Sequence, residues 1–272
     1  MIKTNACFYW DSSTGQTTDL RVISGVIDWL RDRFGKDVTI RIGESDASAM
    51  RVKHVFNVLN YVTLARLKHV ELINLSEGEK FEREISVTGR KIALQFSKTI
   101  LDSDMIVNIP KMKSHPIAAM TCCLKNIYGI IYEPYKWQYH TYLDQVIVAA
   151  NRIIKVDLHV VDAVIARGKY PFKLGLILTG TNALAVDSVS ARIMGYEPSS
   201  ISHLKLAAKE GLGQMQGLDV VGDNPEHFRA VFPRRNVALE NKTLPILYNL
   251  LTLYSRAVGD IIPPAMEKWG SL

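Results

Sequence analysis

Two lysines and a histidine stand close together in the segment PKMKSHP, at residues 110–116. Lys111, Lys113 and His115 follow an apolar stretch at residues 105–109, which predicts a buried strand of a parallel sheet. Ligands of α/β proteins bind just beyond the carboxyl ends of strands. The segment therefore predicts the cationic rim of a ligand site, with an ordinary solvated loop as the alternative.

A third lysine and a second histidine follow. Lys125 and Asn126 are the strongly polar members of the apolar segment MTCCLKNIYG, at residues 120–129. A lysine in such surroundings extends to water, pairs with a carboxylate or binds an anion. His140 comes after an aromatic stretch at residues 135–139. His115 and His140 could form a proton-transfer pair or provide two ligands of a metal.

The candidate acidic residues lie in apolar surroundings or at a strand end. Asp162 is expected in an apolar strand, and Asp187 in a helix among valine and alanine residues. A shielded carboxylate needs a partner, for which Lys125 is one option, and a helix cap or surface ion pair is the alternative. Glu44 and Ser45 follow another predicted strand, so they could form the second side of a cleft or an ordinary turn.

Strands alternate with helices along the chain, which is typical of α/β layer architectures. Hydrophobic periodicity predicts helices at residues 19–34, 50–68, 141–155, 183–194, 202–210 and 245–258. Strands are expected at 38–43, 70–75, 105–109, 156–164 and 174–178, with a hairpin at 86–94. We expect two α/β units, residues 1–95 and 96–230, with mixed or mostly parallel sheets and a cleft between them. Residues 231–272 would form a C-terminal helical extension.

Composition limits the class of protein. The 272 residues are 47% hydrophobic and 22% charged, as in ordinary globular proteins. The three cysteines form no Cys-x-x-Cys, so no iron–sulfur or zinc-finger ligand set is expected. Cys122 and Cys123 are interpreted as small apolar packing residues. Stretches without charge reach only 13 residues, short of the ~20 that span a bilayer. We expect a soluble cytoplasmic protein that does not bind membranes.

These residues resemble the hallmark of domain-of-unknown-function family 362. The likeness rests on DMIVNIPKMKSH at 104–115, TCCLKNIYG at 121–129, His140, VVDAV at 160–164, NALAVD at 182–187, IMGY at 193–196, and SHL and GLG within 202–213. Segments near residues 2–5, 17–18 and 42–45 match more loosely, so the likeness covers residues 1–222. Members of the family often carry a ferredoxin-like cluster domain. Its absence here implies a separate redox partner protein for any electron transfer.

A more distant likeness suggests chemistry. His115, Lys125 and His140 are spaced by 10 and 15 residues, which is similar to the pattern of the nickel-pincer lactate racemases. The likeness implies a lysine that neutralises an anionic part of a metal-containing organic cofactor. It also implies histidines that ligate metal or transfer protons. Gly43-Glu44-Ser45 stands where those enzymes have Gly-Thr-His.

We therefore expect an enzyme that acts on an anionic small molecule by isomerisation or redox chemistry. One wall of its cleft would contain Lys111, Lys113, His115, Lys125, Asn126 and His140. The other would contain Glu44, Ser45, Lys3 and Asn5. Lys113 and Lys125 would hold the anion, His115 and His140 would transfer protons or bind a transition metal, and Asp162 and Asp187 would orient or neutralise the cations.

Two other functions stay open. A non-catalytic binder or carrier of an anionic cofactor would use the same lysines without needing the histidines. Nucleic-acid association through the net charge of +6 is the weaker alternative, supported by the basic residues Arg229, Arg234, Arg235 and Lys242. The apolar helix expected at residues 245–258 could be a contact between subunits of a homo-oligomer.

Overall fold

The described part of the computed structural model, residues 1–7, 9–47 and 50–234, forms one eight-stranded main sheet. Its order is β3-β2-β1-β6-β9-β7-β8, and β10 pairs with β9. Bounds are β1 Ile2–Lys3, β2 Arg41–Glu44, β3 Glu71–Asn74, β6 Val107–Asn108, β7 Lys111–His115, β8 Ala119–Thr121, β9 Leu158–Arg167 and β10 Pro171–Gly180. Pairing is parallel from β3 through β9 and between β9 and β7, whereas β8 and β10 pair antiparallel. The fold is therefore α/β with a mostly parallel main sheet, as predicted.

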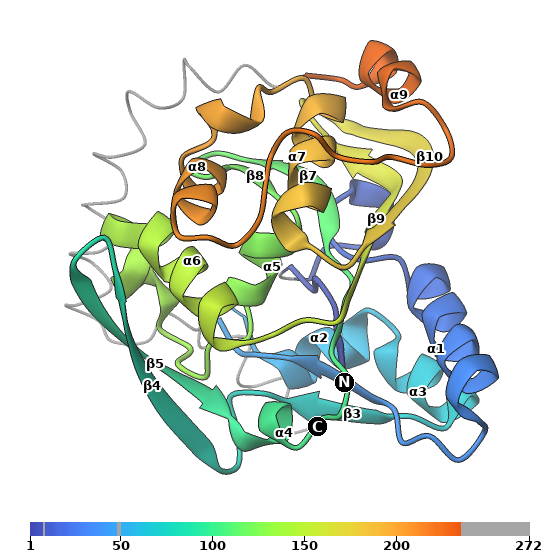
Figure 1. Cartoon of the computed structure of the whole chain (residues 1–272). Coiled ribbons are helices and arrows are strands. Elements are labelled where there is room, and N and C mark those ends of the chain that lie inside the picture. Colours follow the sequence, from blue (N-terminus) through green and yellow to red (C-terminus); the bar gives the residue numbers. More distant parts are fainter. Residues whose placement is uncertain (8, 48–49, 235–272) are drawn as a thin grey trace.

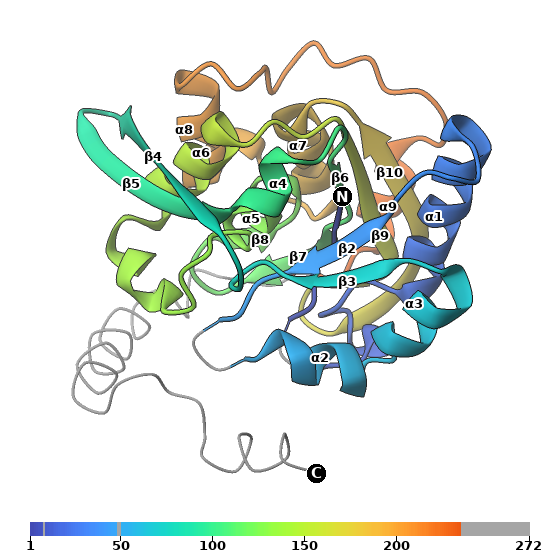
Figure 2. The ribbon, with the colours of Figure 1, turned by 90° about the horizontal axis from the view of Figure 1, so that it is seen from below.

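Helices lie on both sides of this sheet (Figure 1). Helices α1 Leu20–Phe34, α2 Val52–Val58 and α3 Tyr61–Lys68 gather on one side, and Figure 2 shows the same grouping from below. The other side carries α5 Cys123–Tyr128, α6 Leu143–Ile153, α7 Ala183–Ile193 and α8 Ser202–Lys209. The remaining short helices are α4 Lys98–Leu101, α9 Pro225–Val231, η1 Ser12–Thr14, η2 Lys136–Tyr142 and η3 Pro198–Ser200.

Two hydrophobic cores follow from this arrangement. Neighbouring residues of β9 point to opposite faces, so that Val160 joins the core under α1 to α3 while Val161 joins the core under α5 to α8. The second core extends to a separate hairpin, β4 Lys80–Val87 and β5 Arg90–Ser97, through Leu94 and Phe96. Residues 1–95 and 96–230 thus contribute strands to one continuous sheet.

Most predicted elements are present, and two predictions are wrong. The helix predicted over residues 50–68 is two helices, because Asn60 takes a left-handed conformation with φ of 62° between α2 and α3. The polar segment after residue 109 is the buried strand β7 rather than a loop. Helix α1 begins as expected, with the Asp19 side chain accepting the backbone N–H of Arg21 at 2.9 Å.

Some predictions concern residues outside the described part of the chain. The helix expected at residues 245–258 and the basic residues Arg235 and Lys242 are among them. Of the other basic candidates, Arg229 pairs with Glu226 at 3.2 Å. Among the described helices, none combines the length and apolarity that crossing a membrane requires.

Candidate functional site

A cavity of about 420 Å³ opens where β1, β2 and β7 end. Its walls come from the loops that follow these strands, from β8 and α5, and from η2. The lining includes Lys3, Asn5, Glu44, Ser45, Lys113, His115, Thr121, Lys125, Asn126, Lys136, Trp137 and His140. The carboxyl ends of parallel strands thus converge on a single hollow, which is where α/β sheets bind ligands.

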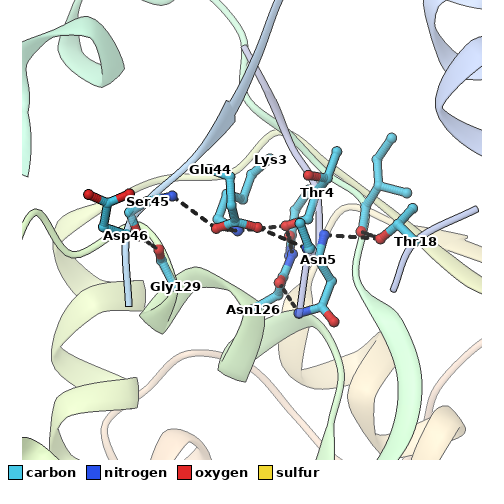
Figure 3. A network of polar contacts seen from close by, with 12 residues as sticks. Lys3, Thr4, Asn5, Thr18, Glu44, Ser45, Asp46, Asn126 and Gly129 are labelled. Atoms are coloured by element: carbon cyan, nitrogen blue, oxygen red, sulfur yellow. Dashed lines mark hydrogen bonds and ion pairs between the residues drawn. The ribbon is translucent and has the colours of Figure 1, made fainter. Parts of the chain in front are cut away.

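The side of the cavity formed by β1 and β2 is held by a buried ion pair. Lys3 Nζ lies 2.6 Å from Glu44 Oε1 and donates to the Thr4 carbonyl at 2.6 Å. Glu44 also accepts the backbone N–H group of Ala6 at 3.0 Å. It accepts that of Ser45 at 3.1 Å as well (Figure 3). Burial lowers the pKa of Lys3, and the Glu44 charge opposes that shift. Glu44 is therefore fully engaged by the protein and neutralises Lys3.

Asn126 links α5 to strand β6 and to the loop after β1. Its Nδ2 donates to the Thr4 carbonyl at 3.1 Å and to Asn108 Oδ1 at 2.7 Å. Its Oδ1 accepts from Asn5 Nδ2 at 2.8 Å, as Figure 3 shows. With its donors and acceptor satisfied inside the protein, Asn126 positions the wall that carries Lys125.

Lys136 is a buried lysine of the cavity that the sequence analysis missed. Its Nζ donates to Ser45 Oγ and to the Asp46 carbonyl, each at 2.6 Å. Ser45 Oγ in turn contacts the Gly129 carbonyl. Burial lowers the pKa of Lys136 to about 7. Lys136 therefore connects η2 to the loop after β2, and the Ser45 hydroxyl is one of its hydrogen-bond acceptors.

Lys113 and Lys125 form the cationic side of the cavity. Lys113 is buried and donates to the Gln16 carbonyl at 2.7 Å. Lys125 lies over the ring of Tyr128, with Nζ 5.6 Å from the ring centroid, and forms no ion pair among the described residues. Burial, reinforced by the charge of Lys113, lowers the pKa of Lys125 to about 8. A bound anion would supply the missing counter-charge.

The two histidines have opposite tautomers. His115 Nδ1 accepts the backbone N–H groups of Ile117 at 3.2 Å and Ala118 at 3.1 Å, so the proton of the neutral ring is on Nε2. His140 Nδ1 lies 3.2 Å from the Lys136 carbonyl, which can only accept, so Nδ1 carries the proton and Nε2 the lone pair. His115 thus has a hydrogen-bond donor at Nε2, and His140 has its lone pair at Nε2.

Both rings are held neutral. Burial, followed by the charge of Lys125, lowers the pKa of His140 to about 4 and that of His115 well below its usual value. The His140 ring also stacks on Trp137 at 4.6 Å between centroids.

We expect the His140 ring to stay neutral from pH 8 down to about pH 5. Desolvation and the nearby Lys125 charge disfavour the imidazolium until the pH approaches 4. NMR of protein with 13C-labelled histidine, with the His140→Gln variant to assign the signal, measures this directly. A His140 signal that titrates near 6.5 would contradict the described environment.

Three of the predicted residues lie outside the lining. Lys111 and Asp162 form an ion pair in the core, with Lys111 Nζ 2.9 Å from Asp162 Oδ2. Asp187 accepts the backbone N–H groups of Cys123 at 2.6 Å and Leu124 at 3.0 Å. These carboxylates fix the core and the start of α5, and neither forms an ion pair with Lys125 among the described contacts.

Cys122, Cys123 and Asp187 are a group of three buried potential metal ligands whose ligand atoms lie within 4.8 Å of one another. Burial raises the pKa of both thiols, and it raises the pKa of Asp187 to about 6. Because the thiols are protonated and both Asp187 oxygens already accept N–H groups, this arrangement suits a helix cap better than a metal site.

His203, on α8, is a second residue that the sequence analysis missed. It is completely buried, and neither ring nitrogen has a partner among the described residues. Burial, together with the Lys125 charge, lowers its pKa to about 3. The residue type gave no signal, because isolated histidines are more often structural. Its place beside Lys125 follows only from the packing of α8.

Comparison with known proteins supports a family relationship. The sequence pattern of the domain of unknown function DUF362 matches residues 1–192. The chain is also similar to a thylakoid-associated protein of Synechocystis sp., with 28% identity over 168 residues. This match covers 56% of the chain and 49% of the relative, so the chain spans about half the length of the curated relative it matches. No solved structure matches. The chain belongs to the DUF362 family.

Proposed function

We propose that this protein is an enzyme that moves a proton at the carbon beside an anionic group of a small molecule. The observation that carries the proposal is the pair of opposite histidine tautomers in a cavity where Lys113 and Lys125 have no carboxylate partner among the described residues. Lys113 and Lys125 hold the anion. His140 Nε2 removes the proton, and His115 Nε2–H donates to the oxygen on which negative charge develops.

The low pKa of His140 is compatible with a role as a base. Its pKa is near 4 because burial and the charge of Lys125 disfavour the imidazolium. An anion bound at Lys125 offsets that charge, so the pKa of His140 rises when the cavity is filled. The proton that His140 takes from carbon is then returned to a neighbouring carbon, which gives an isomerisation without an external oxidant, or to the same carbon, which gives exchange with solvent.

A resident metal fits these residues less well. A catalytic metal site needs about three protein ligands. With His115 Nδ1 already accepting two backbone N–H groups, its Nε2 keeps a proton and cannot ligate. The proposed reaction therefore includes no metal-dependent step.

Proton exchange tests the proposal. The protein, purified anaerobically without chelators, is incubated in D2O with lactate, malate or 3-phosphoglycerate, and deuterium at carbon is followed by NMR. We expect exchange with at least one acid and a loss of roughly 100-fold or more in His140→Gln. Sulfate affinity, measured by calorimetry, should persist in that variant because the lysines remain.

A different outcome would favour a binder or carrier of an anion. Binding of sulfate together with no exchange for any of the three acids would overturn the enzymatic proposal. So would exchange that is equally fast in wild type and in the His115→Gln, His140→Gln double variant.

A further inference from the structure

We propose that the anion held in the cavity is a tetrahedral dianion, a phosphate group, and that Thr121 is one of the residues that recognise it. This inference rests on the proposed function for the site, and it names the substrate class. The shared chemistry covers free phosphate and a phosphomonoester.

The charges in the cavity favour two negative charges rather than one. Among the described residues of the lining, four are lysines and the one carboxylate is Glu44. Glu44 is taken by Lys3 at 2.6 Å, so this pair is neutral. Lys136 also lacks a carboxylate, but three oxygen acceptors at 2.6, 2.6 and 3.5 Å hold its ammonium group, and burial lowers its pKa to about 7. Lys113 and Lys125 remain with no carboxylate, and a dianion balances both.

An unused hydroxyl lies in the same wall. Thr121 is only 3% exposed, lines the cavity, and its Oγ1 has no hydrogen-bond partner among the described residues. Leaving a buried hydroxyl without a partner costs free energy. A ligand oxygen in the cavity would remove that cost.

The strand pairing puts these donors on one face. Thr121 of β8 lies directly opposite Lys113 of β7 in the antiparallel register. His115 is two residues after Lys113, so its side chain leaves β7 on the same side. Lys125 follows on the first turns of α5. Two ammonium groups and a hydroxyl supply enough donors for several oxygens of one tetrahedral anion, and the His115 N–H on the same face stays available for the oxygen on which charge develops.

Isothermal titration calorimetry at constant ionic strength tests this proposal without any turnover. Sulfate and inorganic phosphate are compared with acetate, a monoanion, and with malate, whose two charges are separated. We expect sulfate and phosphate to bind at least tenfold more tightly than acetate and more tightly than malate. Phosphoserine separates the two sources of the dianion: tighter binding than phosphate supports a phosphomonoester substrate, whereas weaker binding identifies a free-phosphate site and contradicts the proposed proton transfer at carbon.

A matched pair of variants assigns the role of the hydroxyl. Thr17 is also a buried threonine whose hydroxyl has no partner in the described part of the chain, but it lies outside the cavity lining. Thr121→Val should lower sulfate affinity by roughly threefold to tenfold, as loss of one hydrogen bond does, while Thr17→Val leaves it unchanged. Neither variant should unfold, because valine replaces a threonine hydroxyl that made no hydrogen bond.

Different results would overturn the dianion site and the proposed enzymatic role. Acetate or malate binding as tightly as sulfate, or equal affinities in Thr121→Val and wild type, would overturn the dianion site even if proton exchange is observed. Tight sulfate binding with no exchange of any acid would retain the dianion site and overturn the enzymatic role.

Discussion

Replacing Asp162 with alanine is expected to lower the free energy of unfolding by about 3–5 kcal/mol, because it leaves an unpaired charge in the core. Both side chains of the Lys111–Asp162 pair are 0% exposed. Asp162 also accepts the backbone N–H groups of Asp19 at 2.7 Å and Val164 at 3.0 Å. Its removal therefore breaks the ion pair and two backbone hydrogen bonds together. Urea unfolding at pH 7 measures the loss.

Two control variants test whether the loss of stability comes from leaving a charge buried and unpaired, rather than from the loss of any ion pair. Glu79→Ala breaks the exposed pair with Lys98 and should leave the urea midpoint unchanged, since surface pairs contribute little. The double variant Lys111→Met, Asp162→Leu should recover part of the lost stability, because no charge is left buried. Asp162→Ala that unfolds at the same urea concentration as Glu79→Ala would contradict the described core.

The position of Lys111 in the core could not be predicted from the sequence. Alternation in a strand would put Lys111, Lys113 and His115 on one face, so all three looked equivalent. The pairing of β7 with β9 shifts register between Lys111 and Lys113, where Asp162 and Arg167 are the successive partners. That irregularity sends Lys111 to Asp162 in the core and leaves Lys113 at the cavity. Bulges depend on the neighbouring strand, which no local pattern in residues 110–116 encodes.

The α/β class, by contrast, could be predicted because its signals are local. The periodicity of α1 and α7 was visible in the sequence, and the structure adds the caps Asp19 and Asn182 at their first turns. Helix α2 ended early because Asn60 takes a left-handed conformation, which asparagine permits but does not require. Local propensity therefore predicts elements well and their breaks poorly.

The site was predictable in part for the same reason. His115, Lys125 and His140 stood out by residue type and spacing, and the structure brings them to one cavity. Lys136 and Thr121 carried no such signal, since a lysine beside aromatic residues and a lone threonine are common on surfaces. Their importance comes from burial and from which partners they have or lack, and both properties are set by tertiary packing.

Replacing Lys125 with methionine is expected to remove most sulfate binding without destabilising the fold. Methionine keeps the length of the side chain and its contact with the Tyr128 ring but removes the charge. We expect a loss of affinity of roughly tenfold to a hundredfold at pH 7, the range for one charge-assisted hydrogen bond. Calorimetry measures the affinity, and urea unfolding of the same samples measures stability. Lys98→Met, on the exposed helix α4, is the matched control.

The pH dependence of the free energy of unfolding, compared between wild type and Lys125→Met, tests whether Lys125 has the lowered pKa. Its pKa is lowered to about 8 in the folded protein, below the ~10.4 of an unfolded lysine, so the unfolded state binds more protons between these values. Lys125 therefore makes stability rise with pH from about 8 to 10.4, and Lys125→Met should lose that part of the rise. The same ammonium group interacts with Lys113, His115, His140, His203 and Cys7, which remain in both proteins.

The affinity for sulfate should fall with rising pH, whereas the contribution of Lys125 to stability rises. Sulfate keeps two charges across this range, so its affinity for wild type should fall as Lys125 loses its proton above pH 8. In Lys125→Met the affinity should be low and should lack the fall centred near pH 8, while the titration of Lys136 near pH 7 contributes equally to both proteins. A wild-type affinity that is flat over this range, together with normal binding by the variant, would show that Lys125 does not contact the anion. Such a result would leave Lys113 and Thr121 to hold it.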